Sequence, residues 1–280
     1  MTKLLRVIAG AGALVWMSAA SPVLGADIPA RPIVKAPVAA PAYNWYGFFI
    51  GVQGGYGWGS NPVTFASATP PYLSAIGTTI PASMADDPRG GTVGITYGSN
   101  WQLGQWVIGT ISDFSWADIR RSEALTLSNA LIPIATRANF AEQRMRWFGT
   151  TRGRVGYLIA QNVLLYGSGG LATGNVDVTV ANTAVGVPCA VAGACPAGAF
   201  RKTRWGWAAG AGVEYGAGPW MFNLEYLHYD LGTQSFLYGD GISPALLSAS
   251  TKISGDMVRG AISYRFNWTP WGLLFGTDRL

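Results

Sequence analysis

The feature of the sequence that most constrains the fold is a strict alternation of side-chain types near the C-terminal end. In residues 258–266, VRGAISYRF, the apolar residues Val258, Ile262 and Tyr264 share one parity, and Arg259 and Arg265 share the other. Successive residues of a β-strand point to opposite faces, so this pattern predicts a strand with one apolar face and one small or charged face. Similar alternation, least clean at 163–174, predicts eight strands in all, at 45–59, 91–97, 105–116, 146–157, 163–174, 203–215, 220–230 and 252–266.

The connections between these segments alternate in length. Short links are predicted around 98–104, 159–162 and 216–219, and long polar or Ala/Ser/Pro-rich connections at about 60–90, 117–145, 175–202 and 231–253. Short turns at one end and long loops at the other, in an even-stranded meander, are the arrangement of outer-membrane barrels. We therefore expect an all-β fold, an eight-stranded antiparallel up-and-down transmembrane β-barrel whose apolar strand faces contact lipid.

Aromatic residues of the outward parity recur ten residues apart. Ten residues of a strand span about 33 Å, and at a tilt near 40° this is a height of about 25 Å, the apolar band of such barrels. The spacing therefore predicts two aromatic girdles, one at each membrane interface. The pairs are Tyr46 and Tyr56, Trp106 and Trp116, Trp147 and Tyr157, and Trp205 and Tyr215.

The N-terminal region has the organisation of an export signal. Lys3 and Arg6 precede an apolar run that ends near Ala20, followed by a small-residue site, SPVLGAD. The run is too short to span a membrane stably, so we expect a cleaved signal peptide (1–25). A Pro-rich periplasmic linker (26–44), the barrel (45–268) and a C-terminal tail (269–280) are expected to follow. Cleavage lowers the formal charge from +5 to +3 (5 − 2), without a polybasic run, so no nucleic-acid partner is expected.

The inward parity carries several charged residues. An eight-stranded barrel is just wide enough for its own side chains to fill, or for one small ligand. Because buried charges are costly unless they are paired, we expect a paired network that closes the lumen; a narrow ion pathway is the alternative. The predicted members are Asp113, Arg152, Arg154, Glu214, Glu225, Arg259 and Arg265.

The predicted outer connections carry basic residues and both cysteines. Arginine and lysine pair with phosphate by charge and geometry, so these residues are candidates for lipopolysaccharide contact; ordinary solvated loop charge is the alternative. An exported chain meets oxidising conditions, and Cys189 and Cys195 bracket a short spacer, so a disulfide is expected. The basic candidates are Arg120, Arg121, Arg137, Arg144, Arg146, Arg201, Lys202 and Arg204.

The sequence offers little support for catalysis. It has no GxGxxG before a helix, no phosphate-binding loop and no GxSxG, and its single histidine, His228, shares the parity of Tyr226 on the predicted lipid face. A catalytic partnership of His228 with Glu225 is the alternative to an interfacial histidine. Two cysteines and one histidine are too few ligands for zinc. We therefore expect a protein that is not an enzyme and has neither cofactor nor metal.

Several segments in fixed order resemble one family. They are the opening ADIPARPIVKAPVAAPAYNWYGFFIGVQGGYGWG and the segments TRGRVGY (151–157), WGWAAGAGVEYG (205–216), NLEYLHYDLG (223–232) and VRGAISYRF (258–266). With these segments the chain resembles the small outer-membrane β-barrel proteins of α-proteobacteria, the porin-family or outer-membrane immunogenic proteins. The resemblance implies an OmpA-like barrel in the outer membrane. It also implies that the barrel-insertion machinery reads the terminal aromatics Tyr264 and Phe266, although 14 residues (280 − 266) follow them here.

Together these features predict a structural and surface role. The expected barrel supports the outer membrane, contacts its lipids and lipopolysaccharide, and presents four loops to the host or the environment. A small porin-like diffusion channel is one alternative. Because members of the resembling family are variously described as structural, porin-like or haemin-binding, a surface module that binds haemin or a host molecule is another.

Overall fold

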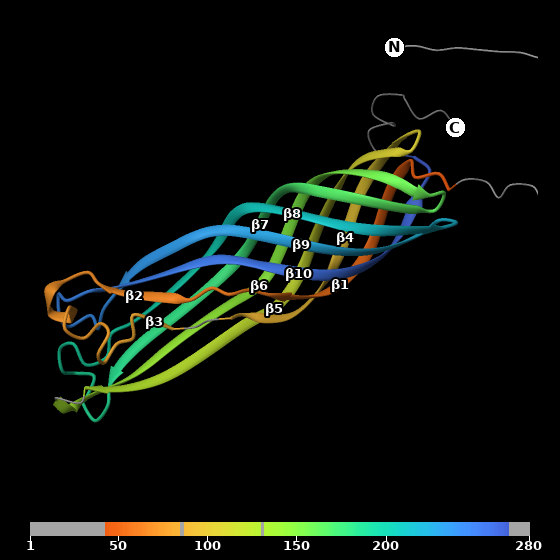
Figure 1. Cartoon of the computed structure of the whole chain (residues 1–280). Coiled ribbons are helices and arrows are strands. Elements are labelled where there is room, and N and C mark those ends of the chain that lie inside the picture. Colours follow the sequence, from red (N-terminus) through yellow and green to blue (C-terminus); the bar gives the residue numbers. More distant parts are fainter. Residues whose placement is uncertain (1–42, 85–86, 130–131, 269–280) are drawn as a thin grey trace, which may run out of the picture. The chain divides into compact units, whose positions relative to one another are not determined.

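The computed structural model of the chain describes residues 43–84, 87–129 and 132–268 (Figure 1). All of them belong to one compact unit, residues 41–280. The predicted signal peptide (1–25), all but the last two residues of the predicted linker (26–44) and the predicted tail (269–280) lie outside the described residues.

Eight strands form a closed ring in which each strand pairs antiparallel with the next ring strand in the chain (Figure 1). Pairing of the first strand with the last, from Phe48 opposite Phe266 to Trp58 opposite Asp256, closes the ring. Closure satisfies the backbone groups that lipid cannot. The predicted eight-stranded barrel is confirmed. Its strands are β1 (Gly47–Trp58), β4 (Arg89–Leu103), β5 (Trp106–Asn129), β6 (Ile132–Ala160), β7 (Val163–Ala184), β8 (Ala197–Ala217), β9 (Trp220–Tyr238) and β10 (Leu247–Phe266).

Most of these strands extend well beyond the predicted segments, at the end where long loops were expected. β5 and β6 continue as a paired hairpin as far as Asn129 and Ile132. The predicted loops at 117–145 and 175–202 are therefore largely strand, and this part of the prediction was wrong. One cause is a register shift between Trp116 and Ile119, because a bulge interrupts the alternation from which a strand is recognised.

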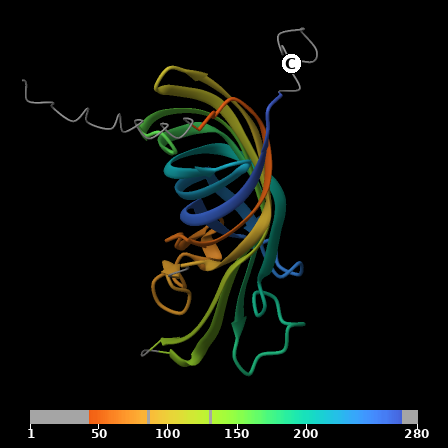
Figure 2. The same ribbon diagram turned by 90° about the vertical axis from the view of Figure 1, so that its right-hand side faces the viewer.

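The segment between β1 and β4, which was also expected to be a loop, contains three short elements. β2 (Val63–Ser67) pairs with the outer part of β10, β3 (Ser83–Met84) pairs with β2, and the 3-10 helix η1 (Pro70–Tyr72) lies between them in the chain. Figure 2 shows this segment, in orange, at the same end of the barrel as the long hairpin extensions. Among the residues that the structure describes, no helix is long and apolar enough to cross a membrane.

Two-residue turns join the strands at the opposite end. Gly104 and Gly218 begin the β4–β5 and β8–β9 turns with φ values of 64° and 60°, a conformation that residues with a Cβ rarely adopt. The first turn was predicted at 98–104, but residues 98–103 continue β4. Gly, Ser and Asn residues there have the composition of a turn, yet Asn100 is completely buried inside the barrel.

The two faces of the ring carry opposite kinds of side chain. On the outside, the apolar side chains of Val52, Leu171 and Trp205 are 62%, 61% and 67% exposed, whereas the inward Arg152 is 1% exposed. This inverted distribution is what a wall in contact with lipid requires. It also accounts for a composition of 49% hydrophobic residues in a chain whose barrel carries charged side chains in the middle of its interior.

The aromatic pairs of β5 and β6 fall into two rows, as predicted. At the turn end Trp106 lies opposite Tyr157, and ten residues away Trp116 lies opposite Trp147. The rings of Trp106 and Tyr157 have centroids 5.1 Å apart. Because β5 and β6 run antiparallel, equal spacing along each strand brings the residues near the turns together and the residues near the long hairpins together. We call these the lower and the upper aromatic row.

Candidate functional site

Four charged side chains form a network across the middle of the lumen. Arg152 on β6 donates to both carboxylate oxygens of Glu225 on β9, over 2.6 and 3.1 Å. Arg259 on β10 donates to both oxygens of Asp113 on β5, over 2.9 Å each. Arg259 also reaches Glu225 at 2.8 Å, and Arg152 reaches Asp113 at 3.3 Å. Each guanidinium thus bridges both carboxylates, and the network of two cations and two anions is neutral.

Two hydroxyl groups complete the hydrogen bonds of this network. Thr150 donates to Asp113 over 2.5 Å and accepts from Nε of Arg152 over 2.9 Å. Ser168 on β7 accepts from Arg152 over 2.6 Å. A buried guanidinium whose donors are all occupied avoids the large cost of an unpaired polar group.

A second, separate pair lies nearer the turn end of the lumen. Arg154 donates to Glu214 over 2.8 Å and to the side-chain oxygen of Asn100 over 2.9 and 2.6 Å. The guanidinium also lies over the rings of Phe49 and Tyr166, 4.8 and 5.3 Å from their centroids. The single network that the sequence predicted is therefore two separate units.

Arg265 joins neither unit, which corrects its predicted place in the lumen network. It lies at the turn end of β10, where it donates to the backbone oxygen of Tyr46 over 2.9 Å and to the side chains of Tyr43 and Asn267 over 3.2 and 2.7 Å. Its parity is inward, but the wall ends there, so the guanidinium finds partners at the mouth of the barrel.

The chain segment that precedes β1 fills this mouth. Trp45 is fully buried and packs against Phe49, Leu164 and Met221. Its backbone N–H donates to the side chain of Gln102 over 2.9 Å. Apolar side chains therefore occupy the lumen below the level of the charged residues.

The outer half of the barrel has an apolar interior, unlike the middle. Val63, Phe65 and Ile80 from the segment between β1 and β4 are buried against side chains of the surrounding strands, such as Met145 and Val178. The side chain of Asn139 on β6 donates to the backbone oxygen of Thr79 over 3.0 Å, which holds this segment inside the wall. The lumen is thus filled at three levels by three kinds of contact.

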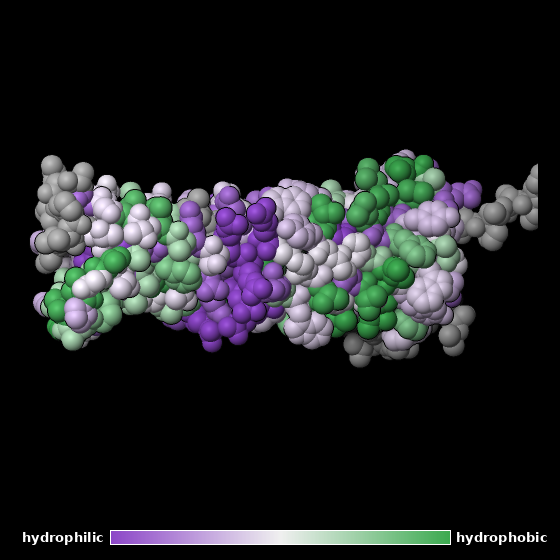
Figure 3. Space-filling model, turned by 90° about the horizontal axis from the view of Figure 1, so that it is seen from below, coloured by the Kyte–Doolittle hydropathy of each residue, from purple (hydrophilic) through white to green (hydrophobic). Residues whose placement is uncertain are grey.

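A set of cations lies on the outside of the barrel, just beyond the upper aromatic row. We define this outer belt as Arg89, Arg120, Arg144, Arg146 and Arg201. The predicted candidates Arg121, Lys202 and Arg204 lie at the same level, but register pairs them with Gln143, Val176 and Gly174, on the inward side of their strands. Figure 3 shows a hydrophilic band, in purple, between the green apolar zone and the outer hairpins. Strand register places Arg89, Arg120, Arg144, Asp177 and Arg201 directly opposite one another in a single row.

Two aspartates are shared among four of these arginines. Asp118 lies 3.6 Å from Arg120 and 3.3 Å from Arg144. Asp177 lies 2.9 Å from Arg146 and 3.0 Å from Arg201. Like charges directly opposite in a sheet are destabilising, so a row in which cations outnumber anions gains from an external anion.

The remaining basic candidates differ in their surroundings. Nζ of Lys202 lies 6.0 Å from the ring centroid of Phe200, and Arg204 donates to the side chain of Gln234 over 3.0 Å. Arg121 has no ion pair among the described residues. Arg137 lies beyond the belt, where it donates to the backbone oxygens of Asn182 and Gly193, so it is not part of the belt.

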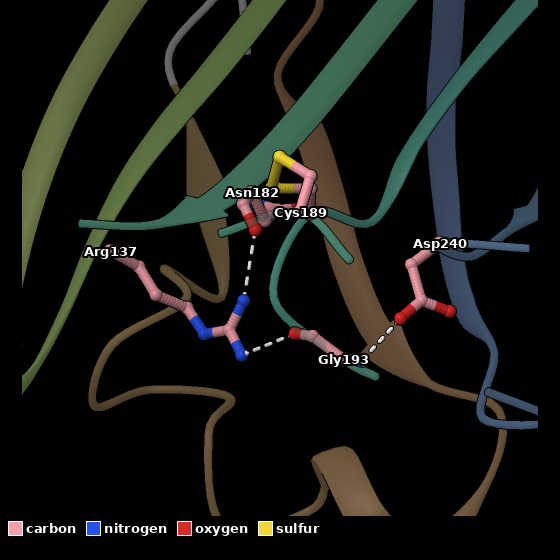
Figure 4. The surroundings of a disulfide bond; sticks show 6 residues. Arg137, Asn182, Cys189, Gly193 and Asp240 are labelled. Carbon is pink, nitrogen blue, oxygen red and sulfur yellow. Dashed lines mark hydrogen bonds between the residues drawn. A yellow bond between two sulfur atoms is a disulfide. The ribbon is translucent and has the colours of Figure 1, made fainter. Parts of the chain in front are cut away.

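The loop between β7 and β8 contains a disulfide. Cys189 and Cys195 are joined, with Cα atoms 5.2 Å apart. Between them, Gly193 accepts from Arg137 over 2.9 Å and donates its N–H to the carboxylate of Asp240 in the neighbouring β9–β10 loop (Figure 4). Backbone N–H groups of Ser243 and Gly193 stabilise the ionised carboxylate and hold the pKa of Asp240 below its ordinary value.

His228 lies on the outer face, on the same side of β9 as Tyr226. Its Nδ1 is 2.8 Å from Oδ1 of Asp256, which also accepts from the hydroxyl of Tyr226 over 2.6 Å. Glu225 points the other way, into the lumen network, so the alternative pairing of His228 with Glu225 does not form. The described residues contain no group of three or more His, Cys, Asp or Glu side chains that could hold a metal ion.

The aromatic residues that end β10 form a cluster at the turn end. The ring of Tyr264 lies 5.4 Å from that of Trp220 and 5.0 Å from that of Phe266. The backbone N–H of Phe48 donates to the oxygen of Trp268 over 2.8 Å, so ladder contacts continue past Phe266. Recognition of Tyr264 and Phe266 by the insertion machinery stays a prediction.

Sequence reasoning missed the acidic partners on the outside and the neutral partners inside. Asp118 and Asp177 fell in regions expected to be loops, and Asn100 in an expected turn. The outward position of Asp256, by contrast, follows from the sequence, because this residue shares the parity of Val258.

Comparisons with known proteins agree with this architecture. Residues 32–266 match the family model described as the outer membrane protein beta-barrel domain. The 31 kDa outer-membrane immunogenic protein of Brucella melitensis is 30% identical over 245 residues, 83% of this chain and 89% of that protein. The 22 kDa outer membrane protein of Rhizobium leguminosarum bv. viciae is 30% identical over 213 residues, 73% of this chain and 76% of that protein. Among solved structures, OprG from Pseudomonas aeruginosa is similar with 10% identity and a TM-score of 0.43, over 80% of this chain and 97% of that one.

Proposed function

The chain belongs to the outer membrane protein β-barrel family, and from this premise we propose that it is a non-conducting structural barrel of the outer membrane. The family places it in that membrane, surrounded by lipid and lipopolysaccharide. The names of the matched relatives carry no enzymatic activity, which supports a role without catalysis.

The observation that carries the proposal is the neutral network of Asp113, Arg152, Glu225 and Arg259. Their side chains are at most 4% exposed, although they lie in the middle of a lumen that a pore would keep wet. A permeant ion would have to break at least one of the bidentate contacts, each of which a low-dielectric interior strengthens. Trp45 below the network and the apolar cluster above it add two further barriers.

The outer belt supports contact with lipopolysaccharide as part of the same role. Four arginines share two aspartates, and Arg89 has no ion pair in the described part of the chain, so the belt retains unneutralised cations at the level just outside the apolar zone. Guanidinium groups bind phosphate through paired, charge-assisted hydrogen bonds. The phosphates of lipopolysaccharide would supply the anions that the row of opposing arginines lacks.

Single-channel recording tests the closed lumen. The mature protein, refolded into a planar bilayer, is expected to be electrically silent, as is Arg146→Ala, which removes an exposed arginine from the same strand as Arg152. Arg152→Ala combined with Trp45→Ala loosens two of the three levels and is expected to give brief openings. A steady conductance of the wild-type protein would show instead that the chain is a small diffusion channel.

Binding to defined lipids tests the belt. Arg146→Ala with Arg201→Ala should weaken binding to phosphorylated lipid A in mixed micelles, with little change for lipid A from which the phosphates have been removed. The matched control is Arg137→Ala, an arginine on β6 beyond the belt. Equal binding of the double variant and the wild type to phosphorylated lipid A would end the proposed contact.

A further inference from the structure

A hollow of about 620 Å³ opens on the outside of the barrel at the level of the outer belt. Its wall comes from β1, β9 and β10, with residues that begin β4 and the chain immediately before it along another side. The side chains that matter for the argument are Tyr56, Trp58, Asp87, Arg89, His228 and Asp256. The lumen network and the disulfide loop contribute nothing to it.

Strand register explains why these residues meet. Arg89 lies opposite Trp58, Trp58 opposite Asp256, and Asp256 opposite His228. Four strands therefore present a cation, an indole, a carboxylate and an imidazole in one row, over three strand spacings or about 14 Å. Tyr56 follows one step lower on β1, so the lower wall of the hollow is aromatic and its upper wall is polar.

The polar groups of the hollow have hydrogen-bonding capacity to spare. One oxygen of Asp256 is engaged by Tyr226 and His228, but its Oδ2 has no partner among the described residues. Within the described ranges, the carboxylate of Asp87, the guanidinium of Arg89 and the hydroxyl of Ser60 make no hydrogen bond or ion pair either. Donors and acceptors that remain without partners thus lie around an aromatic surface, where a ligand could pair with them.

This combination fits a sugar better than other ligands of the membrane surface. A free phosphate would face two carboxylates, an acyl chain would leave the charged groups without partners, and the described residues hold no metal-binding cluster. A sugar ring presents polarised C–H groups, which suit the negative face of an aromatic ring, and hydroxyls that both donate and accept.

We propose that this hollow binds a saccharide of the outer-leaflet lipopolysaccharide, with a sugar ring against Trp58 and Tyr56 and its hydroxyls on Asp87, Arg89 and Asp256. The proposal rests on the proposed contact of the belt with lipopolysaccharide, because Arg89 belongs to both. The belt holds the phosphates, and the adjoining hollow holds a sugar carried by the same lipid. The length of the row leaves room for more than one ring.

Calorimetric titration of the full chain in detergent micelles separates the two contacts. The probes are the delipidated core oligosaccharide of lipopolysaccharide, phosphorylated lipid A without core sugars, and a panel of free neutral hexoses. The wild type is expected to bind the core oligosaccharide saturably. Trp58→Leu and Asp256→Asn should each weaken that binding roughly tenfold, the effect of losing one or two good contacts, and leave lipid A binding unchanged.

Two controls complete the design. Trp116→Leu removes another exposed tryptophan of the upper aromatic row, outside the hollow, and should leave oligosaccharide binding unchanged. Arg146→Ala should weaken lipid A binding alone, so failure of the belt and failure of the hollow are distinguishable. No saturable oligosaccharide binding, or equal affinities for Trp58→Leu, Asp256→Asn and Trp116→Leu, would overturn the proposal. Binding of free hexoses without binding of the core oligosaccharide would overturn lipopolysaccharide as the source.

Discussion

Arg152→Ala is the substitution that most directly tests how the lumen is stabilised. Removing this guanidinium deletes contacts to Glu225, Asp113, Thr150 and Ser168 at once. The network changes from neutral to one net negative charge, and Arg259 is left to neutralise two buried carboxylates. Breaking a buried ion pair by removing one partner costs about 3–5 kcal/mol. Because Arg259 still contacts both acids, we expect the lower end of that range, about 3 kcal/mol.

Equilibrium unfolding in guanidinium chloride, followed by tryptophan fluorescence of the protein in phospholipid vesicles, measures this cost. The control is Arg146→Ala on the same strand, whose partner Asp177 is shared with Arg201 and whose side chain is 47% exposed. An exposed pair contributes only about 0–1 kcal/mol, so the control should unfold close to the wild-type midpoint.

A double variant distinguishes charge balance from lost packing. Arg152→Met with Glu225→Gln removes one charge of each sign and leaves the bidentate pair of Arg259 and Asp113 in place. The double variant should lose less stability than the sum of the two single variants, by about 0.5–3 kcal/mol, the range found for coupled neighbours. If Arg152→Ala is as stable as Arg146→Ala, or if the two single effects simply add, the four charged residues are not energetically coupled.

Three other perturbations have clear expected outcomes. Gly98→Ala would place a Cβ 2.0 Å from a backbone oxygen of the neighbouring strand and should destabilise the barrel by more than 1 kcal/mol, whereas Gly153→Ala, whose nearest atom is 4.0 Å away, should be tolerated in the same unfolding assay. Because the pKa of Asp240 is lowered, its contribution to loop stability is present above the ordinary pKa and is lost as pH falls through the lowered pKa. Proteolysis near Gly193 should therefore increase at low pH in the wild type and already at neutral pH in Asp240→Asn. Unchanged cleavage in both proteins would contradict this. Trp45→Ala alone should leave the bilayer silent, because two filled levels remain, and steady current from it would place the main barrier at the mouth.

The membrane part of the barrel could be read from the sequence because lipid imposes a strict rule on it. Outward residues in that zone must be mostly apolar or small, and inward ones are free to be polar, so alternation is visible at β10 and β8. Lipid leaves no partner for an open sheet edge, and the even number of ring strands makes the closing pair of β1 and β10 antiparallel. Phe49 is an exception, because it is a large apolar residue at an inward position of β1. Alternation still predicts its direction correctly, since it points inward and lies beneath Arg154.

The outer half could not be read in the same way. Beyond the membrane both faces of a strand are free to be polar, so the alternation fades although pairing continues, as in the extensions of β5 and β6. The irregularity between Met145 and Phe148 also reverses which residues of β6 face inward: Thr150 and Arg152 are buried on one side of it, and Gln143 and Met145 on the other. The division of the lumen charges into a four-residue network and the Arg154–Glu214 pair depends on strand stagger, which no single strand reveals.

The arginines inside the barrel and those of the outer belt have opposite charge environments. Inside, where the dielectric is low, an unpaired guanidinium would be severely destabilising, and Arg152, Arg154 and Arg259 each contact a carboxylate at 2.9 Å or less. At the rim, water and headgroups lower that cost, and the row from Arg89 to Arg201 keeps more cations than anions. Neutrality inside therefore supports a closed wall, and excess charge outside supports an external anionic partner. Glu225→Gln would leave the buried network with one net positive charge. It should therefore lower the stability of the barrel in the unfolding assay without changing lipid A binding by the outer belt.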